Sequence, residues 1–222
     1  MNIVTRKLIA KEIYVYRWFL VGASVAGVVT VLICALGKTG FNVGSLGWIT
    51  TIVALGVMLG IYGISYERKE NALSFVLSLP LDAGDYVRAK VIGLGICFFV
   101  PWLISSVAAM VLILAKESVP DGLVPYTVLL CVFMFTNFCW VVCGALHGRT
   151  EAWMTTVIII TNMAVSIFMF TVGAIPGIQD TMFGAVPVWN DTFWTVLVIE
   201  LLALIVALVL PQFTVARRRD FI

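Results

Sequence analysis

Three side chains that bind soft metal ions share one stretch of the sequence, Cys139, Cys143 and His147, and His147 is the only histidine. Their spacing of four residues places them on one face of a helix. Thiolate and imidazole groups are ligands for zinc and copper. Eight residues of helix separate the outer two by roughly 12 Å, so only neighbouring pairs could share an ion. Ordinary packing explains the row as well, and we predict no metal site.

Catalytic chemistry has few other groups to use. No GxSxG or HExxH sequence occurs, and a Ser–His pairing would have to use His147. No two carboxylates face each other inside the apolar segments. We therefore predict no catalytic residue, and a protease or phosphatase is the weakest functional alternative.

Glu200 is the only acidic or basic side chain well inside an apolar segment. A carboxylate in the membrane is costly and marks a functional or interhelical polar site. Helical rise puts it roughly 12 Å from Thr192, close to the depth of Asn162 on the preceding segment. We predict that Glu200 faces protein or a water-filled path with Asn162 as its partner. The alternative is a protonated residue that serves only helix packing.

The elements that must position these groups are membrane helices. The chain has 222 residues, of which 62% are hydrophobic and 12% charged, and its mean hydropathy is +1.09. These values exclude a soluble globular domain. About 20 apolar residues cross a bilayer, and six such runs occur, so we predict an all-α, polytopic, single transmembrane domain over residues 1–222. The predicted spans are 18–36, 46–66, 91–115, 124–147, 153–175 and 192–213.

The basic residues predict the orientation of the spans. Twelve of the 14 precede the first span, follow the last, or lie between spans two and three or four and five; Lys38 and Lys116 are the exceptions. Lys and Arg near span ends stay in the cytoplasm, so both termini are expected there. The net charge of +2 is then a topology signal and gives no reason to expect nucleic acid.

The segment before the first span has amphipathic spacing. Leu8, Ile9, Ile13 and Tyr16 recur near the helical period, which suits a helix lying along the membrane interface. An ordinary basic flank is the alternative. Small residues at Ala23/Gly27 and Gly56/Gly60 permit close helix contacts, either within one subunit or between two.

Residues 66–90, "YERKENALSFVLSLPLDAGDYVRAK", are the only long polar stretch. Leu73, Val76, Leu77 and Pro80 follow the spacing i, i+3, i+4, i+7, which predicts a short helix with one apolar face. Pro80 disfavours helix in the residue before it, and Asp82 is placed to cap the helix that follows.

This stretch carries a family resemblance. Glu67-Arg68-Lys69-Glu70, then Leu77-Ser78-Leu79-Pro80-Leu81, and Lys90 resemble the signature loop of the type-2 ABC exporter permeases. The resemblance implies six spans with cytoplasmic termini, an amphipathic amino-terminal interfacial helix and a cytoplasmic coupling helix between spans two and three. It assigns ATPase coupling to Glu67, Arg68, Glu70, Leu73, Leu77, Pro80 and Lys90. It also implies a membrane-dipping outer segment, for which residues 176–191 are the candidate; an ordinary interfacial loop is the other interpretation.

The same resemblance implies partners and location. Two copies of a separate ABC ATPase, a second permease copy or a related permease, and membrane lipids are expected. No GxxxxGK[ST] sequence occurs, so we predict no cofactor and no ATPase activity in this chain, with ATP and Mg bound by the partner. The expected location is the plasma membrane, the inner membrane in a bacterium. A secondary transporter is the main alternative, although the two halves show no obvious repeat.

Overall fold

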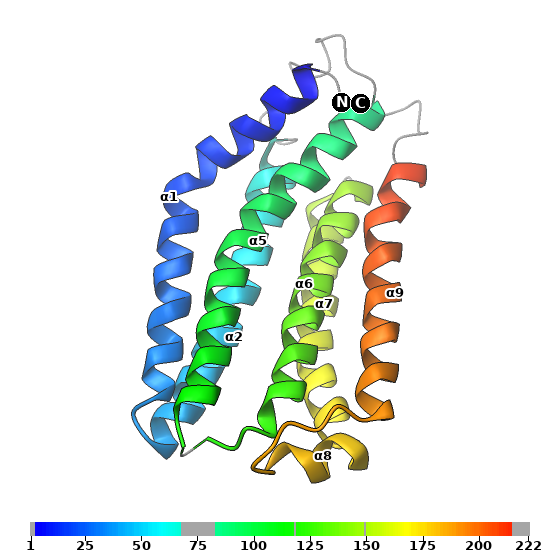
Figure 1. The fold of residues 1–222 in the computed structure, drawn as a ribbon. Helices are drawn as coiled ribbons and strands as arrows, with labels where there is room; N and C mark the ends of the chain where they lie inside the picture. The colour runs from blue at the N-terminus through cyan, green and yellow to red at the C-terminus, as the bar shows by residue number, and fades with distance from the viewer. Residues whose placement is uncertain (1–2, 68–82, 118, 149, 215–222) are drawn as a thin grey trace.

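The computed structural model describes residues 3–67, 83–117, 119–148 and 150–214, and within these ranges the regular elements are helices. Figure 1 shows them as a bundle with a short crosswise helix at one end. The elements are α1 (Ile3–Cys34), α2 (Lys38–Gly60), η1 (Ile61–Tyr66), α5 (Ala83–Ala115), α6 (Leu123–His147), α7 (Glu151–Gly173), α8 (Pro176–Met182) and α9 (Asp191–Thr214).

Six segments in the described part of the chain are long and apolar enough to cross a membrane. They are Val4–Cys34, Lys38–Tyr66, Gly84–Ala115, Leu123–His147, Glu151–Gly173 and Asp191–Thr214. This result confirms the all-α class and the six predicted spans. The second helix begins at Lys38 rather than at residue 46, because Gly37 has a φ of 96° and turns the chain directly after α1.

The predicted amino-terminal amphipathic segment is the first part of α1, and Figure 1 shows this part slanting relative to the rest of the helix. Ile9 is buried, and Leu8 and Tyr16 pack against the core. Ile13 is exposed, and the side of the helix that meets α5 contains Glu12; that this segment lies along the membrane interface stays a prediction. The predicted coupling helix and its Asp82 cap lie outside the described residues.

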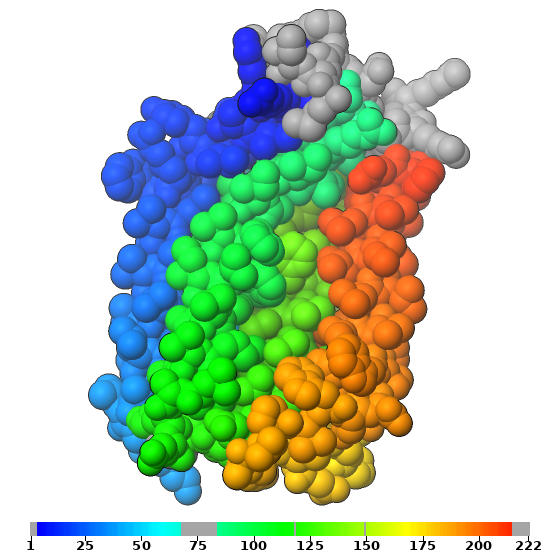
Figure 2. Space-filling model, in the orientation of Figure 1, coloured from blue at the N-terminus to red at the C-terminus, as the bar shows by residue number. Residues whose placement is uncertain are grey.

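Helix α6 is the centre of the bundle and packs against α2, α5, α7 and α9. Figure 2 shows it set back between α5 and α9 on the face drawn. Phe138 of α6 stacks on Phe98 of α5 with ring centroids 4.1 Å apart. By contrast, only four of the residues of α9 are buried: Phe193, Glu200, Ala207 and Pro211. Helix α9 therefore touches the bundle along one narrow stripe.

The small residues make close contacts inside this chain. A Cβ placed on Gly27 would lie 2.9 Å from the Cβ of Ser105, and one on Gly60 would lie 2.8 Å from Val141. Gly56 has Phe138 and Phe98 within 3.4 Å of the same position. Packing within one subunit therefore accounts for these glycines.

Residues 176–191 begin with the short helix α8, which lies across the end of the bundle opposite to residues 3 and 214 (Figure 1). It packs against α6, α7 and α9, with Ile178 buried. Asn190 ends the segment by accepting a hydrogen bond from the Phe193 backbone N–H at 2.9 Å, which caps α9. Whether this segment enters the membrane stays a prediction.

Candidate functional site

Four charged side chains meet at the end of the bundle where α1 begins, and we call them the charge cluster: Lys11, Glu12, Glu67 and Lys90. The Lys90 Nζ lies 2.7 Å from Glu12 Oε1 and 2.6 Å from Glu67 Oε2. The Lys11 Nζ lies 2.8 Å from Glu67 Oε1. Acids and bases alternate, so the formal charge of the cluster is zero and each carboxylate faces a cation.

Three separate segments supply the charge cluster. Lys11 and Glu12 come from α1, Lys90 from the beginning of α5, and Glu67 directly follows η1. The i→i+5 bonds of a π-helix widen the turn by one residue, so η1 sets the direction in which Glu67 leaves the end of α2. The cluster thereby ties α1, the end of α2 and the start of α5 together.

The charge cluster is mostly buried. The side chains of Glu12 and Lys90 are each 4% exposed, Glu67 is 14% exposed, and only Lys11 is half exposed. Gly93 makes room, because a Cβ there would lie 3.1 Å from the Glu12 side chain. Removing one partner of a buried ion pair typically costs about 3–5 kcal/mol, since the other charge stays buried. The cluster therefore restricts how these three segments can move apart.

The pKa of Glu67 reflects these neighbours. Burial alone would raise it, but the ammonium groups of Lys90 and Lys11 outweigh burial and hold the Glu67 pKa below its ordinary value of 4.5. The carboxyl group is therefore ionised at neutral pH, as the ion pairs require.

The structure brings together two of the residues assigned to ATPase coupling, Glu67 and Lys90. Arg68, Glu70, Leu73, Leu77 and Pro80 lie outside the described residues. Sequence reasoning missed Lys11 and Glu12, to which it assigned no role. The available signal was a carboxylate, Glu12, on the same helical face as Ile9, three residues away.

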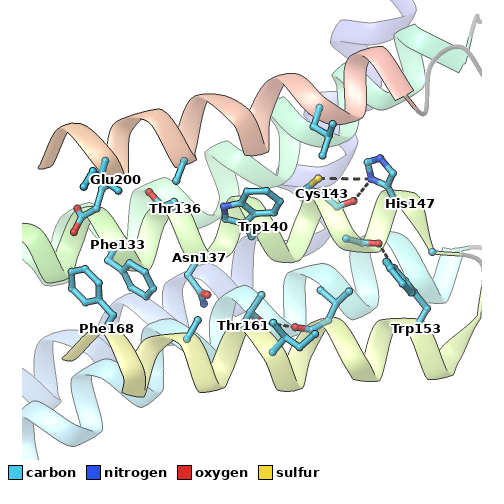
Figure 3. A pocket seen from close by; sticks show the side chains of 18 of the residues that line it. Phe133, Thr136, Asn137, Trp140, Cys143, His147, Trp153, Thr161, Phe168 and Glu200 are labelled. Carbon is cyan, nitrogen blue, oxygen red and sulfur yellow. Dashed lines mark hydrogen bonds between the residues drawn. The ribbon is translucent and has the colours of Figure 1, made fainter. Parts of the chain in front are cut away.

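A second feature is a groove of about 1100 Å³ between α7 and α9, with α6 as its floor. We call it the α7–α9 groove. Its lining is mainly apolar and includes Phe133, Trp140, Phe168, Val172 and Leu210. Figure 3 shows side chains from all three helices reaching into it. The groove opens sideways, because Ile160 and Ile199 line it and are 61% and 62% exposed.

Glu200 lies in this groove and is 4% exposed. Neither of its carboxylate oxygens has a hydrogen-bond partner among the described residues, and the same holds for the side-chain oxygen of Asn162. The predicted Glu200–Asn162 hydrogen bond is therefore wrong. Thr161 lines the groove, whereas Asn162 is the next residue and is turned by about 100° around the helix. Equal depth did not bring equal orientation.

In the row Cys139, Cys143 and His147, the side chain of His147 links α6 to α9. His147 Nδ1 donates to the Cys143 carbonyl oxygen at 2.8 Å, and its Nε2 lies 2.6 Å from Thr214 Oγ1 on α9. The described residues contain no group of three His, Cys, Asp or Glu side chains arranged to hold a metal ion. Trp153 Nε1 on α7 donates to the Gly144 carbonyl oxygen of α6 at 2.9 Å (Figure 3). These bonds join both walls of the α7–α9 groove to its floor.

The sequence was compared with protein families and with known proteins. The model of the ABC-2 family transporter proteins matches residues 7–215, which is most of the chain. This chain belongs to the ABC-2 transporter family. It is also similar to a protein of Bacillus subtilis (strain 168) described as a probable ABC transporter permease, YtrD. The two are 27% identical over 70% of this chain and 48% of the relative, so the chain spans about half of the relative's length.

No solved structure matches this chain. The family match supports an ABC transporter membrane subunit, and it favours a transport subunit over an enzyme. Within this ABC-2 family chain, the charge cluster and the α7–α9 groove are the two features whose chemistry requires a functional interpretation.

We expect Lys90→Met to destabilise this ABC-2 family chain by about 3–5 kcal/mol, because Glu12 and Glu67 would stay buried without their shared cation. For a chain of this size the loss corresponds to a melting temperature lower by about 10 °C. Thermal unfolding in detergent, followed by circular dichroism, measures it. Lys38→Met removes an exposed ammonium group and is the matched control. Equal melting temperatures for the two variants would contradict the role of the cluster.

The lowered pKa of Glu67 predicts a dependence on acid pH. The folded state binds this proton less readily than the unfolded state, so the stabilisation is complete above pH 4.5 and is lost as the pH falls through the lower folded-state pKa. Melting temperatures measured from about pH 6 down to about pH 3 should therefore fall more steeply for the natural chain than for Glu67→Gln. Parallel curves would show that Glu67 is not held ionised by its neighbours.

Proposed function

We propose that this chain is the transmembrane permease subunit of an ATP-driven ABC exporter and that it couples hydrolysis by a separate ATPase subunit to substrate export. The family match carries this proposal. In this assembly ATP and Mg bind to the two ATPase copies. The permease lies in the plasma membrane, which is the inner membrane in a bacterium, and both of its termini are in the cytoplasm.

The charge cluster supports a specific coupling route. Residues 68–82 connect Glu67 to the start of α5 at Ala83, and Lys90 lies two turns into that helix. Glu67 and Lys90 are bonded to each other and, through Lys11 and Glu12, to α1. A displacement of the connecting segment would therefore move α1, the end of α2 and the start of α5 together.

The residues assigned to ATPase coupling are of two kinds, those that position the connecting segment and those that contact the ATPase. Glu67 and Lys90 are too buried to contact a docked ATPase directly, so we assign them the role of positioning residues. Arg68, Glu70, Leu73, Leu77 and Pro80 are the proposed contact residues, on the strength of their sequence pattern. A short apolar-faced helix flanked by charges suits a groove on a partner protein.

The ATPase test uses one variant of each kind. We expect Leu77→Asp to reduce co-purification of the ATPase encoded beside this gene, because a carboxylate would enter an apolar contact. We expect Glu67→Gln to leave co-purification unchanged but to lower export and transport-linked ATP turnover several-fold. Both are measured with reconstituted complexes, and Asp180→Asn, an exposed acid on α8, is the control.

Full co-purification and normal export in Leu77→Asp would remove residues 68–82 from the ATPase contact. Export that persists without any ATPase would favour a secondary transporter instead. Loss of co-purification in Glu67→Gln would mean that this carboxylate acts at the contact and not through the charge cluster.

We propose further that two permease copies assemble with α1, α2 and α7 beside the shared path. The outward face of α1 presents apolar residues in a row, with Val21, Val25 and Val29 each about half exposed. Such a face can pack against lipid or against a second copy. Gly56 and Gly60 already pack inside the chain, so they are not available for this contact.

Crosslinking in native membranes tests the dimer. The five native cysteines are buried, so Val25→Cys introduces an accessible thiol on α1. We expect a short thiol-specific reagent to convert most of this variant to a covalent dimer. Ile205→Cys, at 56% exposure on α9, is the control and should stay mostly monomeric. Equal crosslinking at both positions, or none at Val25→Cys, would argue against α1 as part of the interface.

A further inference from the structure

The α7–α9 groove combines an apolar enclosure with polar atoms that lack partners. Both carboxylate oxygens of Glu200 and the hydroxyl oxygen of Thr136 are buried without a hydrogen-bond partner in the described part of the chain. Both residues line the groove, and Figure 3 shows them in the space between α9 and α6. An unpaired buried carboxylate is costly, so the site is chemically incomplete.

A hydrogen-bond donor with positive charge would complete the site. A carboxylate accepts through both oxygens, and a hydroxyl oxygen accepts as well as donates. An ammonium group has several N–H donors, so one such group can serve Glu200 and Thr136 together. Positive charge also removes the penalty of a lone anion in an apolar site.

Within the part of the chain that the structure describes, no basic side chain is bonded to Glu200. Glu200 lies nine residues after Asp191, about 14 Å along α9. Lys38 and Lys116 lie close to the end of the bundle at which α9 begins with Asp191, and Arg17 is about 26 Å from Cys34 by helical rise. Lys90 is already bonded to two carboxylates. A bound ligand can supply this donor.

The residues that line the groove indicate the size and polarity of the rest of this ligand. Phe133 and Phe168 stack with centroids 4.0 Å apart, and Trp140 adds a third aromatic surface in the same groove. Aromatic faces attract cations and cover apolar groups. A volume of about 1100 Å³ accepts a drug-sized molecule. Because the open side lies between the exposed Ile160 and Ile199, the ligand enters sideways between α7 and α9.

We infer that the α7–α9 groove binds a lipophilic amine, with its ammonium group on Glu200 and Thr136 and its apolar body along Phe133, Trp140 and Phe168. Binding at this site does not depend on the proposed coupling to an ATPase, so it can be tested on the isolated chain. The neutral amine can take the proton of a neutral Glu200 carboxyl group, which leaves an ion pair and no net change in charge.

The experiment uses 11-bromoundecylamine, because bromine quenches nearby tryptophan fluorescence, and Trp140 and Trp153 line the groove. The full chain in lipid nanodiscs is titrated with this amine and with 11-bromoundecanol, which has the same chain without the charge. We expect half-maximal quenching at an amine concentration at least tenfold lower than for the alcohol. Asp180→Asn should keep this preference, and Glu200→Gln should abolish it.

Two further variants locate the site without altering the carboxylate. Trp140→Phe combined with Trp153→Phe should remove the amine-specific part of the quenching. Ala203→Leu fills the groove one turn from Glu200 and should weaken quenching by both compounds. Equal quenching by amine and alcohol in the natural chain, or an unchanged preference in Glu200→Gln, would overturn the inference. So would a groove that excludes both compounds, which would indicate that a protein segment fills it.

Discussion

A charge inside an apolar bundle has to meet an opposite charge or a hydrogen-bond partner. This constraint applies to the charge cluster and to Glu200. At the charge cluster it is satisfied, because Lys90 lies between Glu12 and Glu67 at 2.7 and 2.6 Å. Each ion needs the others, so three segments that are distant in sequence are held in one arrangement. At Glu200 the same constraint is left open by the described residues.

The difference between the two sites follows from how their helices pack. Helices in lipid gain little from hydrophobic burial against each other, so close fit decides which ones associate. Helix α5 packs along α1, and Gly93 leaves space beside Glu12. Helix α9 instead touches α6 along Phe193, Glu200, Ala207 and Pro211, and α7 packs on another side of α6. Two walls that share a floor without filling the space between them create the α7–α9 groove.

Much of the fold could be predicted from the sequence, because span length and apolar composition are local properties. The six spans are confirmed, and they differ from the prediction mainly where the first three begin, at Val4, Lys38 and Gly84. The charge cluster was only half predicted. Glu67 and Lys90 stood out in a polar loop, but the pairing of Glu12 with Lys90 depends on how α1 packs against α5, which no periodic pattern encodes. The coupling helix expected within residues 68–82 stays a prediction.

The α7–α9 groove illustrates a second limit. The depth of Glu200 could be counted along the helix, but the direction in which it points depends on the rotation of α9 against α6. Asn162 was chosen by depth alone, and a rotation of one residue on α7 puts Thr161 and not Asn162 in the groove. Thr136, whose orphan oxygen lines the same groove, carried no signal because threonine is common in membrane helices and usually bonds to its own backbone, as Thr161 does.

Helix η1 sets the helical register at the end of α2. Its i→i+5 hydrogen bonds accommodate one more residue per turn than an α-helix does. If residues 61–66 changed to i→i+4 bonding, everything beyond them would rotate by about 100°, and Glu67 would leave both Lys90 and Lys11. The ion pairs of Glu67 with Lys11 and Lys90 therefore stabilise the π-helical register of residues 61–66.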